Sequence, residues 1–251
     1  MPIAGRFKAD WTETIFLLLG RRKMYRIFAL AFVGVLTSIQ AAAADNVPPP
    51  GFIALFNGRD LTGWKGLLKQ PLDSPAVRTK TPPGQLAAAQ RDADERMRKS
   101  WHVEDGVLIY NGKGSSLCTV KDYRDFELYV DWKIGPRGDS GIYLRGAPQV
   151  QIWDASQWKI GSGGLYNNLK HPSKPLKIAD KPVGQWNTFR IRMIGDKVTV
   201  RLNGELVVDN TVLENYWERD KPIYPSGPIE LQHHGNTLWF KNIYLRELPP
   251  Q

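Results

Sequence analysis

The sequence offers almost nothing for covalent cross-linking, because Cys118 is the single cysteine among its 251 residues. One thiol cannot form an intramolecular disulfide, and a chain of this length can bury a sizeable core without one. We therefore interpret Cys118 as a packed small hydrophobic side chain and not as a nucleophile.

Motifs for metal ions and phosphates are also missing. The four histidines include no His-x-His pair, and His233 and His234 would point to opposite faces of a strand. The glycine-rich stretch at 161–168 lacks the Lys-Ser/Thr ending of a phosphate loop, so its glycines are expected to let the backbone pass close to a ligand or a strand. No cofactor is predicted, and a divalent metal ion stays an open alternative without assigned ligands.

The net charge of +9 does not indicate nucleic-acid binding. Residues 1–44 hold six of the 34 Lys and Arg and two of the 25 Asp and Glu, which leaves 28 against 23, or +5, for the rest. These charges are mixed along the chain, and no basic stripe interleaves with aromatic residues. Nucleic acid is therefore not an expected partner, and the oligomeric state cannot be inferred from the sequence.

The one long apolar run lies near the N-terminus and is too short for a comfortable membrane span. Basic residues at 21–26 precede apolar residues 27–39, and four alanines follow at 41–44. This pattern predicts a signal peptide over 1–44, with Met24 as an alternative start and an uncleaved anchor as the alternative interpretation. The mature part, 45–251, is expected to be periplasmic or secreted, without stable membrane insertion.

Short alternating segments fill the mature part, separated by Gly, Asn, Asp and Pro turns. Asn203 and Gly204, between two such segments, form a strong hairpin signal. The pattern favours one all-β domain, a sandwich or barrel of antiparallel sheets. Residues 65–100 differ in composition, and we interpret them as a surface insertion with one short helix at about 84–98 and no chemical role.

Four predicted strands combine an apolar row with an unusual polar row. The polar rows are expected to hold Glu127, Tyr129, Asp131 and Lys133; Asp139, Tyr143 and Arg145; Gln149, Gln151 and Trp153; and Glu230, Gln232 and His234. If the four strands share one sheet, these rows form one surface. A solvated outer face is one interpretation. The mixture of aromatic, amide and guanidinium groups favours a sugar-binding surface instead.

An ordered set of short motifs resembles the 3-keto-disaccharide hydrolase family over about residues 50–247. The motifs are FNGRDLTGW at 56–64, WHVEDG at 101–106, DSGIYLR at 139–145, QVQIWD at 149–154, GQWN at 184–187, LNG at 202–204, IELQHHG at 229–235 and FKNI at 240–243. The resemblance implies a concanavalin A-like jelly-roll sandwich and an enzyme that cleaves glycosides whose C3 hydroxyl has been oxidised to a ketone.

Two positions depart from the family pattern. Many members have Glu where Gln149 and Asp131 stand here. The related glucanases carry three acids on one strand, and this sequence has only Glu127 and Asp131 in the comparable run. Ordinary retaining hydrolysis is therefore not favoured.

A 3-keto sugar permits another route, because the ketone acidifies the hydrogen on C2. The route needs a base, a stabiliser for the enolate and an acid for the leaving oxygen. We expect His234 or Asp131 as the base, Arg145 as the stabiliser, and Glu230 as the acid or as the group that orients His234. The expected substrate-binding residues are Tyr143, Gln149, Gln151, Trp153, Tyr166 and Gln232.

Two non-catalytic hypotheses compete with this enzyme. A carbohydrate-binding module would keep Trp153 and Tyr143 but would not need His234 or Asp131. A structural module of the cell envelope would bind no sugar at all.

Overall fold

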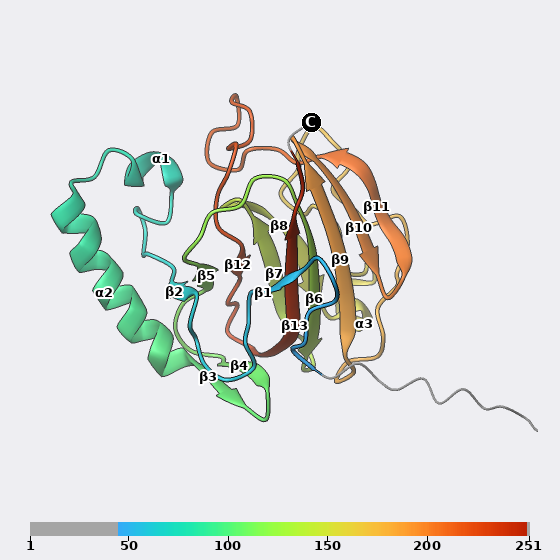
Figure 1. Cartoon of the computed structure of the whole chain (residues 1–251). Helices are drawn as coiled ribbons and strands as arrows, with labels where there is room; N and C mark the ends of the chain where they lie inside the picture. The colour runs from blue at the N-terminus through green and yellow to red at the C-terminus, as the bar shows by residue number, and fades with distance from the viewer. Residues whose placement is uncertain (1–44, 250–251) are drawn as a thin grey trace, which may run out of the picture. The chain divides into compact units, whose positions relative to one another are not determined.

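Two antiparallel sheets face each other in the computed structural model, which describes residues 45–249 (Figure 1). The signal-peptide prediction for 1–44 lies outside the described residues. The two sheets confirm the predicted jelly-roll sandwich, with helices added at its edges. Within residues 45–249, no helix is both long and apolar enough to cross a membrane.

The large sheet has the strand order β11-β10-β9-β6-β13-β4-β3, and β1 pairs with β13. Its strands are β1 (Ile53–Ala54), β3 (Trp101–Glu104), β4 (Val107–Asn111), β6 (Phe126–Ile134), β9 (Asn187–Ile194), β10 (Lys197–Leu202), β11 (Glu205–Val212) and β13 (Thr237–Glu247).

The small sheet has the order β2-β5-β12-β7-β8. Its strands are β2 (Trp64–Gly66), β5 (Leu117–Thr119), β7 (Asp139–Leu144), β8 (Ala147–Trp153) and β12 (Glu230–Leu231). The condition that all four polar rows share one sheet is therefore not met, because β6 belongs to the large sheet and the other three rows belong to the small sheet.

The core lies between the sheets and is built from the apolar rows that alternation predicts. Leu128 and Val130 of β6 are fully buried, as are Ile142 of β7, Ile152 of β8 and Leu231 of β12. Because successive side chains point to opposite faces, burial of these rows leaves the polar rows of β7, β8 and β12 on the outer side of the small sheet.

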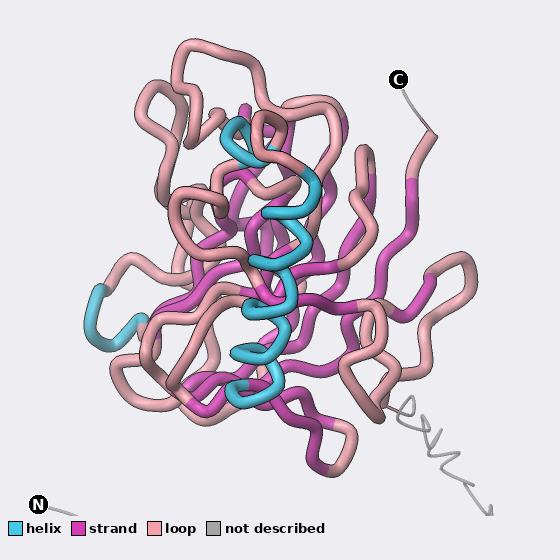
Figure 2. Tube along the Cα trace, turned by 90° about the vertical axis from the view of Figure 1, so that its left-hand side faces the viewer, coloured by secondary structure: helices cyan, strands magenta, loops and turns pink. Residues whose placement is uncertain are grey.

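The insertion is docked on the edge of the small sheet through β2. It contains α1 (Pro75–Arg78) and α2 (Pro83–Ser100), so the predicted helix is confirmed and a second one precedes it. The Gly66 N–H donates to Asp94 Oδ1 at 3.0 Å, and Gln90 Nε2 donates to the Gly66 carbonyl at 2.9 Å. A Cβ on Gly66 would lie 2.2 Å from the Ala93 carbonyl oxygen, so glycine permits this close approach. Figure 2 shows α2 running along this side of the molecule.

The glycine-rich stretch passes along the edge of β8. The Gly163 N–H donates to the Gln151 carbonyl at 2.8 Å, and the Gln151 N–H donates to the Gly164 carbonyl at 2.9 Å. Gly163 has a positive φ of 98°, and a Cβ there would lie 2.6 Å from Val207 Cγ2. These glycines therefore let the backbone approach a strand.

Arg145 does not continue the polar row of β7, because the strand ends at Leu144 and Arg145 has a positive φ of 57°. Its Nη2 pairs with Asp125 Oδ1 at 2.8 Å, and its Nε donates to the Arg124 carbonyl at 2.6 Å. Only 2 % of the Arg145 side chain and 4 % of Asp125 are exposed. The expected role of Arg145 as enolate stabiliser is therefore corrected to that of a buried structural ion pair.

We predict that Arg145→Ala destabilises the fold strongly. Removal of Arg145 leaves the buried Asp125 carboxylate with the exposed Arg124 guanidinium 3.8 Å away and a hydrogen bond from the Gly195 N–H. Loss of one member of a buried pair typically costs about 3–5 kcal/mol and lowers the Tm by roughly 10 °C in a domain of this size. Thermal unfolding measures the effect, and Arg98→Ala, a change on the exposed side of α2, is the control. An unchanged Tm in Arg145→Ala would contradict this account.

Candidate active site

One row of cross-strand partners crosses the whole outer side of the small sheet. Lys65 pairs with Cys118, Cys118 with Glu230, Glu230 with Tyr143, and Tyr143 with Gln149. Paired residues point to the same side of a sheet, so these five side chains share one surface. We call this outer side of β5, β12, β7 and β8 the polar face.

Two further rows lie along the same face. The Gln232 N–H donates to the Gly141 carbonyl, and Gly141 pairs with Gln151. Two residues further along, Asp139 pairs with Trp153, and His234 lies beside Asp139. This surface therefore combines residues that are up to 169 positions apart in the sequence, from Lys65 to His234.

Asp131 is not part of this face. It lies on β6, on the outer side of the large sheet, where Thr188 Oγ1 donates to its Oδ1 at 2.5 Å and Asn242 Nδ2 donates to its Oδ2 at 2.7 Å. The expectation that Asp131 serves as the base is therefore not supported, since the sandwich core separates it from the polar face. Alternation assigned Asp131 correctly to a polar row, but that row belongs to the other sheet.

His234 and Asp139 form the most reactive combination on the polar face. The distance from His234 Nδ1 to Asp139 Oδ2 is 3.7 Å, and the imidazole is 57 % exposed. Burial raises the pKa of Asp139, while the neighbouring His234 and a hydrogen bond from Gln151 act in the opposite direction. The group beside His234 is therefore Asp139, which sequence reasoning placed on the polar face without a role, and not Glu230.

Gln149 and Gln151 hold Asp139 in place. Gln151 Nε2 donates to Asp139 Oδ1 at 2.8 Å, and Gln149 Nε2 donates to Gln151 Oε1 at 2.7 Å. Both glutamines are buried. Gln151 contacts Asp139 directly, and Gln149 contacts Gln151. The structure thus gives these two expected sugar-binding residues a positioning role.

Glu230 is a buried acid in the middle of the face. Burial raises its pKa to about 7, with opposing contributions from Ser116 and Arg78. Ser116 also lies 3.0 Å from His233 Nδ1 through its Oγ and accepts from the His233 N–H. Glu230 therefore holds its proton at pH values where an ordinary glutamate has lost it.

Tyr143 lies next to Glu230 and faces Gln232. Burial raises the pKa of the Tyr143 phenol far above its ordinary value, and the charge of Glu230 acts in the same direction. Gln232 Nε2 lies 3.4 Å from the Tyr143 hydroxyl, and Gln232 Oε1 is buried without a hydrogen-bond partner among residues 45–249. The phenol stays protonated, so it can donate a hydrogen bond to a ligand.

Aromatic rings border the His234 end of the face. Trp153 stacks on Trp158 at 5.5 Å between ring centroids and meets Tyr166 edge-on at 5.4 Å. Trp153 is almost buried, and its Nε1 donates to the Gly161 carbonyl. Trp158 of α3 (Ala155–Trp158) and Tyr166 are the exposed members. Sequence reasoning missed Trp158, although it lies only five positions after Trp153.

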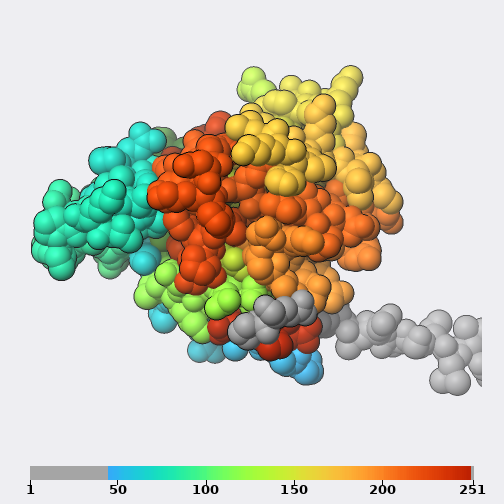
Figure 3. All heavy atoms as spheres, turned by 90° about the horizontal axis from the view of Figure 1, so that it is seen from above, coloured from blue at the N-terminus to red at the C-terminus, as the bar shows by residue number. Residues whose placement is uncertain are grey.

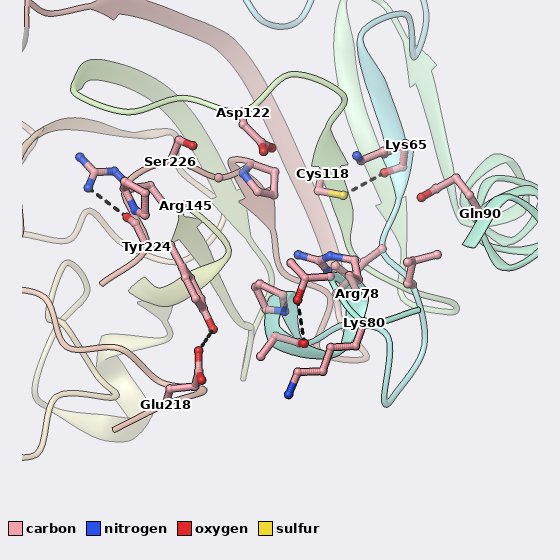
Figure 4. A pocket seen from close by; sticks show the side chains of 18 of the residues that line it. Lys65, Arg78, Lys80, Gln90, Cys118, Asp122, Arg145, Glu218, Tyr224 and Ser226 are labelled. Carbon is pink, nitrogen blue, oxygen red and sulfur yellow. Dashed lines mark hydrogen bonds between the residues drawn. The ribbon is translucent and has the colours of Figure 1, made fainter. Parts of the chain in front are cut away.

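A cavity of about 510 Å³ opens at the other end of the face, where the insertion meets the 213–228 segment (Figure 4). We call it the insertion cavity. Its lining includes Lys65, Arg78, Lys80, Cys118, Asp122 and Tyr224. Figure 3 shows the insertion next to the 213–228 segment. The insertion, to which the sequence assigned no chemical role, therefore shapes a cavity.

Cys118 lies in this lining as a buried free thiol. Burial raises its pKa to about 12, and the charge of Glu230 adds to the effect. A thiol that stays protonated is a poor nucleophile and a poor metal ligand. Within residues 45–249, no group of three or more His, Cys, Asp and Glu side chains is arranged to hold a metal ion.

Comparison with known proteins identifies the family. Residues 51–246 match the 3-keto-alpha-glucoside-1,2-lyase-like domain. The chain belongs to this family. A 3-keto-disaccharide hydrolase of Bacteroides thetaiotaomicron is 24 % identical over 276 aligned positions, which cover 84 % of each chain.

Solved structures agree with the fold. A crystal structure titled as a glycosyl hydrolase of Parabacteroides distasonis superposes with a TM-score of 0.61 at 26 % identity, covering 82 % of this chain and 100 % of the other. A second one from the same organism has a TM-score of 0.59 at 25 % identity, covering 84 % and 97 %. The names of the family and of these relatives denote hydrolases or lyases that act on carbohydrates.

We predict that Glu230→Gln removes a pH-dependent loss of stability. The folded-state pKa of about 7 lies above the ordinary value of 4.5, so the folded protein binds this proton more tightly than the unfolded chain. The contribution of Glu230 is therefore most favourable below pH 4.5 and is lost as the pH rises to 7, by about 3 kcal/mol in total.

Urea unfolding at pH 5 and pH 8 measures this change, and the difference between wild type and Glu230→Gln isolates the one group. Glu95→Gln, a change on the exposed side of α2, is the control and should follow the wild type. Parallel pH profiles for wild type and Glu230→Gln would show that Glu230 titrates normally.

Proposed function

We propose that the protein cleaves the glycosidic bond of 3-keto-glycosides, including 3-keto-disaccharides, by removal of the C2 proton and β-elimination, followed by addition of water. One observation carries the proposal: His234, an exposed imidazole, stands beside the partly buried Asp139 on the polar face. An exposed imidazole beside a carboxylate is a typical general base, because the carboxylate stabilises the imidazolium that forms.

The first step breaks the C2–H bond. The C3 ketone makes this hydrogen acidic, His234 accepts the proton, and the electron pair moves to the C3 oxygen as an enolate. Asp139 stabilises the imidazolium that forms, and Gln151 fixes the carboxylate. The Tyr143 phenol and the Gln232 amide, which lie 3.4 Å apart, supply hydrogen-bond donors for the enolate oxygen.

The second step breaks the bond between C1 and the leaving oxygen. The enolate electrons return to form a C1–C2 double bond, and the leaving oxygen takes a proton from Glu230. With a pKa of about 7, a large fraction of Glu230 is protonated near neutral pH, where an ordinary glutamate is ionised. Glu230 and His234 are four positions apart in the chain and both lie on the polar face, so the reacting sugar ring is placed between the base and the acid. Water then adds to C1 and C2, which gives net hydrolysis.

A carbohydrate-binding module is the second candidate, and the exposed rings of Trp158 and Tyr166 favour it. Aromatic rings stack on the C–H faces of sugars without any catalytic group. A binding module does not explain why His234 is held beside a carboxylate whose own position is fixed by two buried glutamines.

We also propose that the protein acts outside the cytoplasm. The support is the sequence at 21–44, where basic residues, an apolar run and four alanines follow each other in the order of a secretory signal.

We predict that the protein releases product from 3-keto-glucosides and leaves the unoxidised parent sugars intact, because only the ketone acidifies C2. Product release from matched pairs, followed by chromatography with and without EDTA, tests substrate class and metal requirement together. Equal turnover of the parent disaccharide would refute elimination as the mechanism. Binding of the keto sugar without turnover would favour the binding module.

We predict that His234→Ala lowers kcat by about 100-fold or more while the Tm stays within a few degrees, because general-base catalysis typically contributes this factor and the side chain is largely exposed. His102→Ala, the change of an exposed histidine on β3 of the large sheet, is the matched control. Near-normal turnover in His234→Ala would remove this residue from the mechanism.

A further inference from the structure

The insertion cavity carries an excess of positive charge. Lys65, Arg78 and Lys80 line it without an ion-pair partner within 4 Å among residues 45–249. Two other lining cations are already neutralised, since Arg145 pairs with Asp125 and Lys221 pairs with Glu218. Asp122 is the lining acid left to oppose three free cations.

Arg78 is held in position for a ligand. It is the last residue of α1, and its Nη1 donates to the carbonyls of Leu72 and Asp73, at 3.2 and 2.9 Å. These bonds use one of the three guanidinium nitrogens, and the others stay available. The charge of Arg78 lowers the pKa values of Cys118, Tyr224 and Glu230 against larger opposing effects of burial, so its field extends over the cavity. The carboxylate of Asp73 lies near Arg78 but does not line the cavity.

The cavity lies next to one of the proposed catalytic groups. Cys118, which lines the cavity, is the cross-strand partner of Glu230, and Pro228, also in the lining, precedes Glu230 by two residues. Paired residues point to the same side of a sheet, so the cavity begins beside the acid that serves the leaving oxygen. A volume of about 510 Å³ lies inside the range of roughly 300–1,000 Å³ that is usual for small-molecule sites.

We propose that the insertion cavity binds the leaving sugar unit through a carboxylate, so that the preferred substrates are 3-keto-glycosides of a uronic acid. This assignment rests on the proposed function, because it places the leaving group beside Glu230. Arg78 binds the carboxylate with its free guanidinium nitrogens, and Lys65 and Lys80 supply further positive charge.

Ligand binding tests the cavity without any chemistry. NMR titration at low salt with D-glucuronate, D-glucose and inorganic phosphate compares an acidic sugar, a neutral sugar and a bare anion. We expect D-glucuronate to bind most tightly and to weaken as salt is added. Arg78→Gln should weaken glucuronate binding about tenfold or more, because a charge-assisted hydrogen bond is lost. Arg91→Gln, on the exposed side of α2, is the matched control and should bind like the wild type.

Two results would overturn the assignment. Equal binding of D-glucose and D-glucuronate would show that the charge is not used, and tighter binding of phosphate would show an anion site without selectivity for a sugar acid.

Turnover supplies the second arm. The ratio of kcat/KM for a 3-keto-glucoside of glucuronic acid to that of glucose should exceed one in the wild type and fall about tenfold in Arg78→Gln. An unchanged ratio would also refute the assignment. If neither keto sugar is cleaved, the proposed reaction fails, and the binding arm alone still decides whether the cavity selects a sugar acid.

Discussion

The register of β12 in the small sheet is the constraint on which the site depends. This strand consists of Glu230 and Leu231, and it is bonded on one side to β5 and on the other to β7. Leu231 is fully buried in the core, while Glu230 faces the opposite side. A slip by one residue would exchange the two side chains, so burial of Leu231 also fixes Glu230 beside Tyr143. The same alternation carries Gln232 and His234 onto the polar face.

Two segments that lie far apart in the sequence then enclose Glu230 and Tyr143, the side chains that this register brings together. The insertion at 65–100 docks on the β2 edge, and the 213–228 segment lies beside it and lines the same cavity (Figure 3). This enclosure removes water from Glu230 and Tyr143, and burial is the largest cause of the raised pKa of each. The fold thus changes the chemistry of ordinary side chains by covering them, without a bound group.

The sequence predicted the rows but not their distribution between sheets. Alternation gave the correct buried partners for β7, β8 and β12, because burial on one face imposes a period of two. It could not exclude Asp131, since a strand pattern carries no information about which sheet the strand joins. The prediction for Arg145 was wrong for a local reason. Its positive φ ends the alternation just after Leu144, and its partner Asp125 lies on another segment.

Other parts of the site depend on long-range contacts that no local pattern contains. The pairing of Lys65 with Cys118 and of Cys118 with Glu230 joins three distant segments, so the insertion cavity could not be derived from the composition of 65–100. The role of Asp139 was equally hidden, because His234 is 95 positions away along the chain.

The two outer faces of the sandwich treat their acids in opposite ways, and this contrast points to the small sheet as the functional side. On the large sheet, burial would raise the pKa of Glu127, but hydrogen bonds from Arg190 and Arg246 lower it below the usual value. That carboxylate is stabilised in its charged form. On the small sheet, the pKa values of Asp139 and Glu230 are both raised by burial.

Buried acids without a counter-ion lower the stability of a fold, and so does a buried amide oxygen without a donor, such as Gln232 Oε1. The chain has arginines that neutralise Glu127 and Asp125, yet Glu230 has no ion-pair partner within 4 Å in the part of the chain described here. A surface that served only stability would pair these groups, as the large sheet does. Proton transfer requires an acid that holds its proton near neutral pH, and leaving Glu230 unpaired provides one.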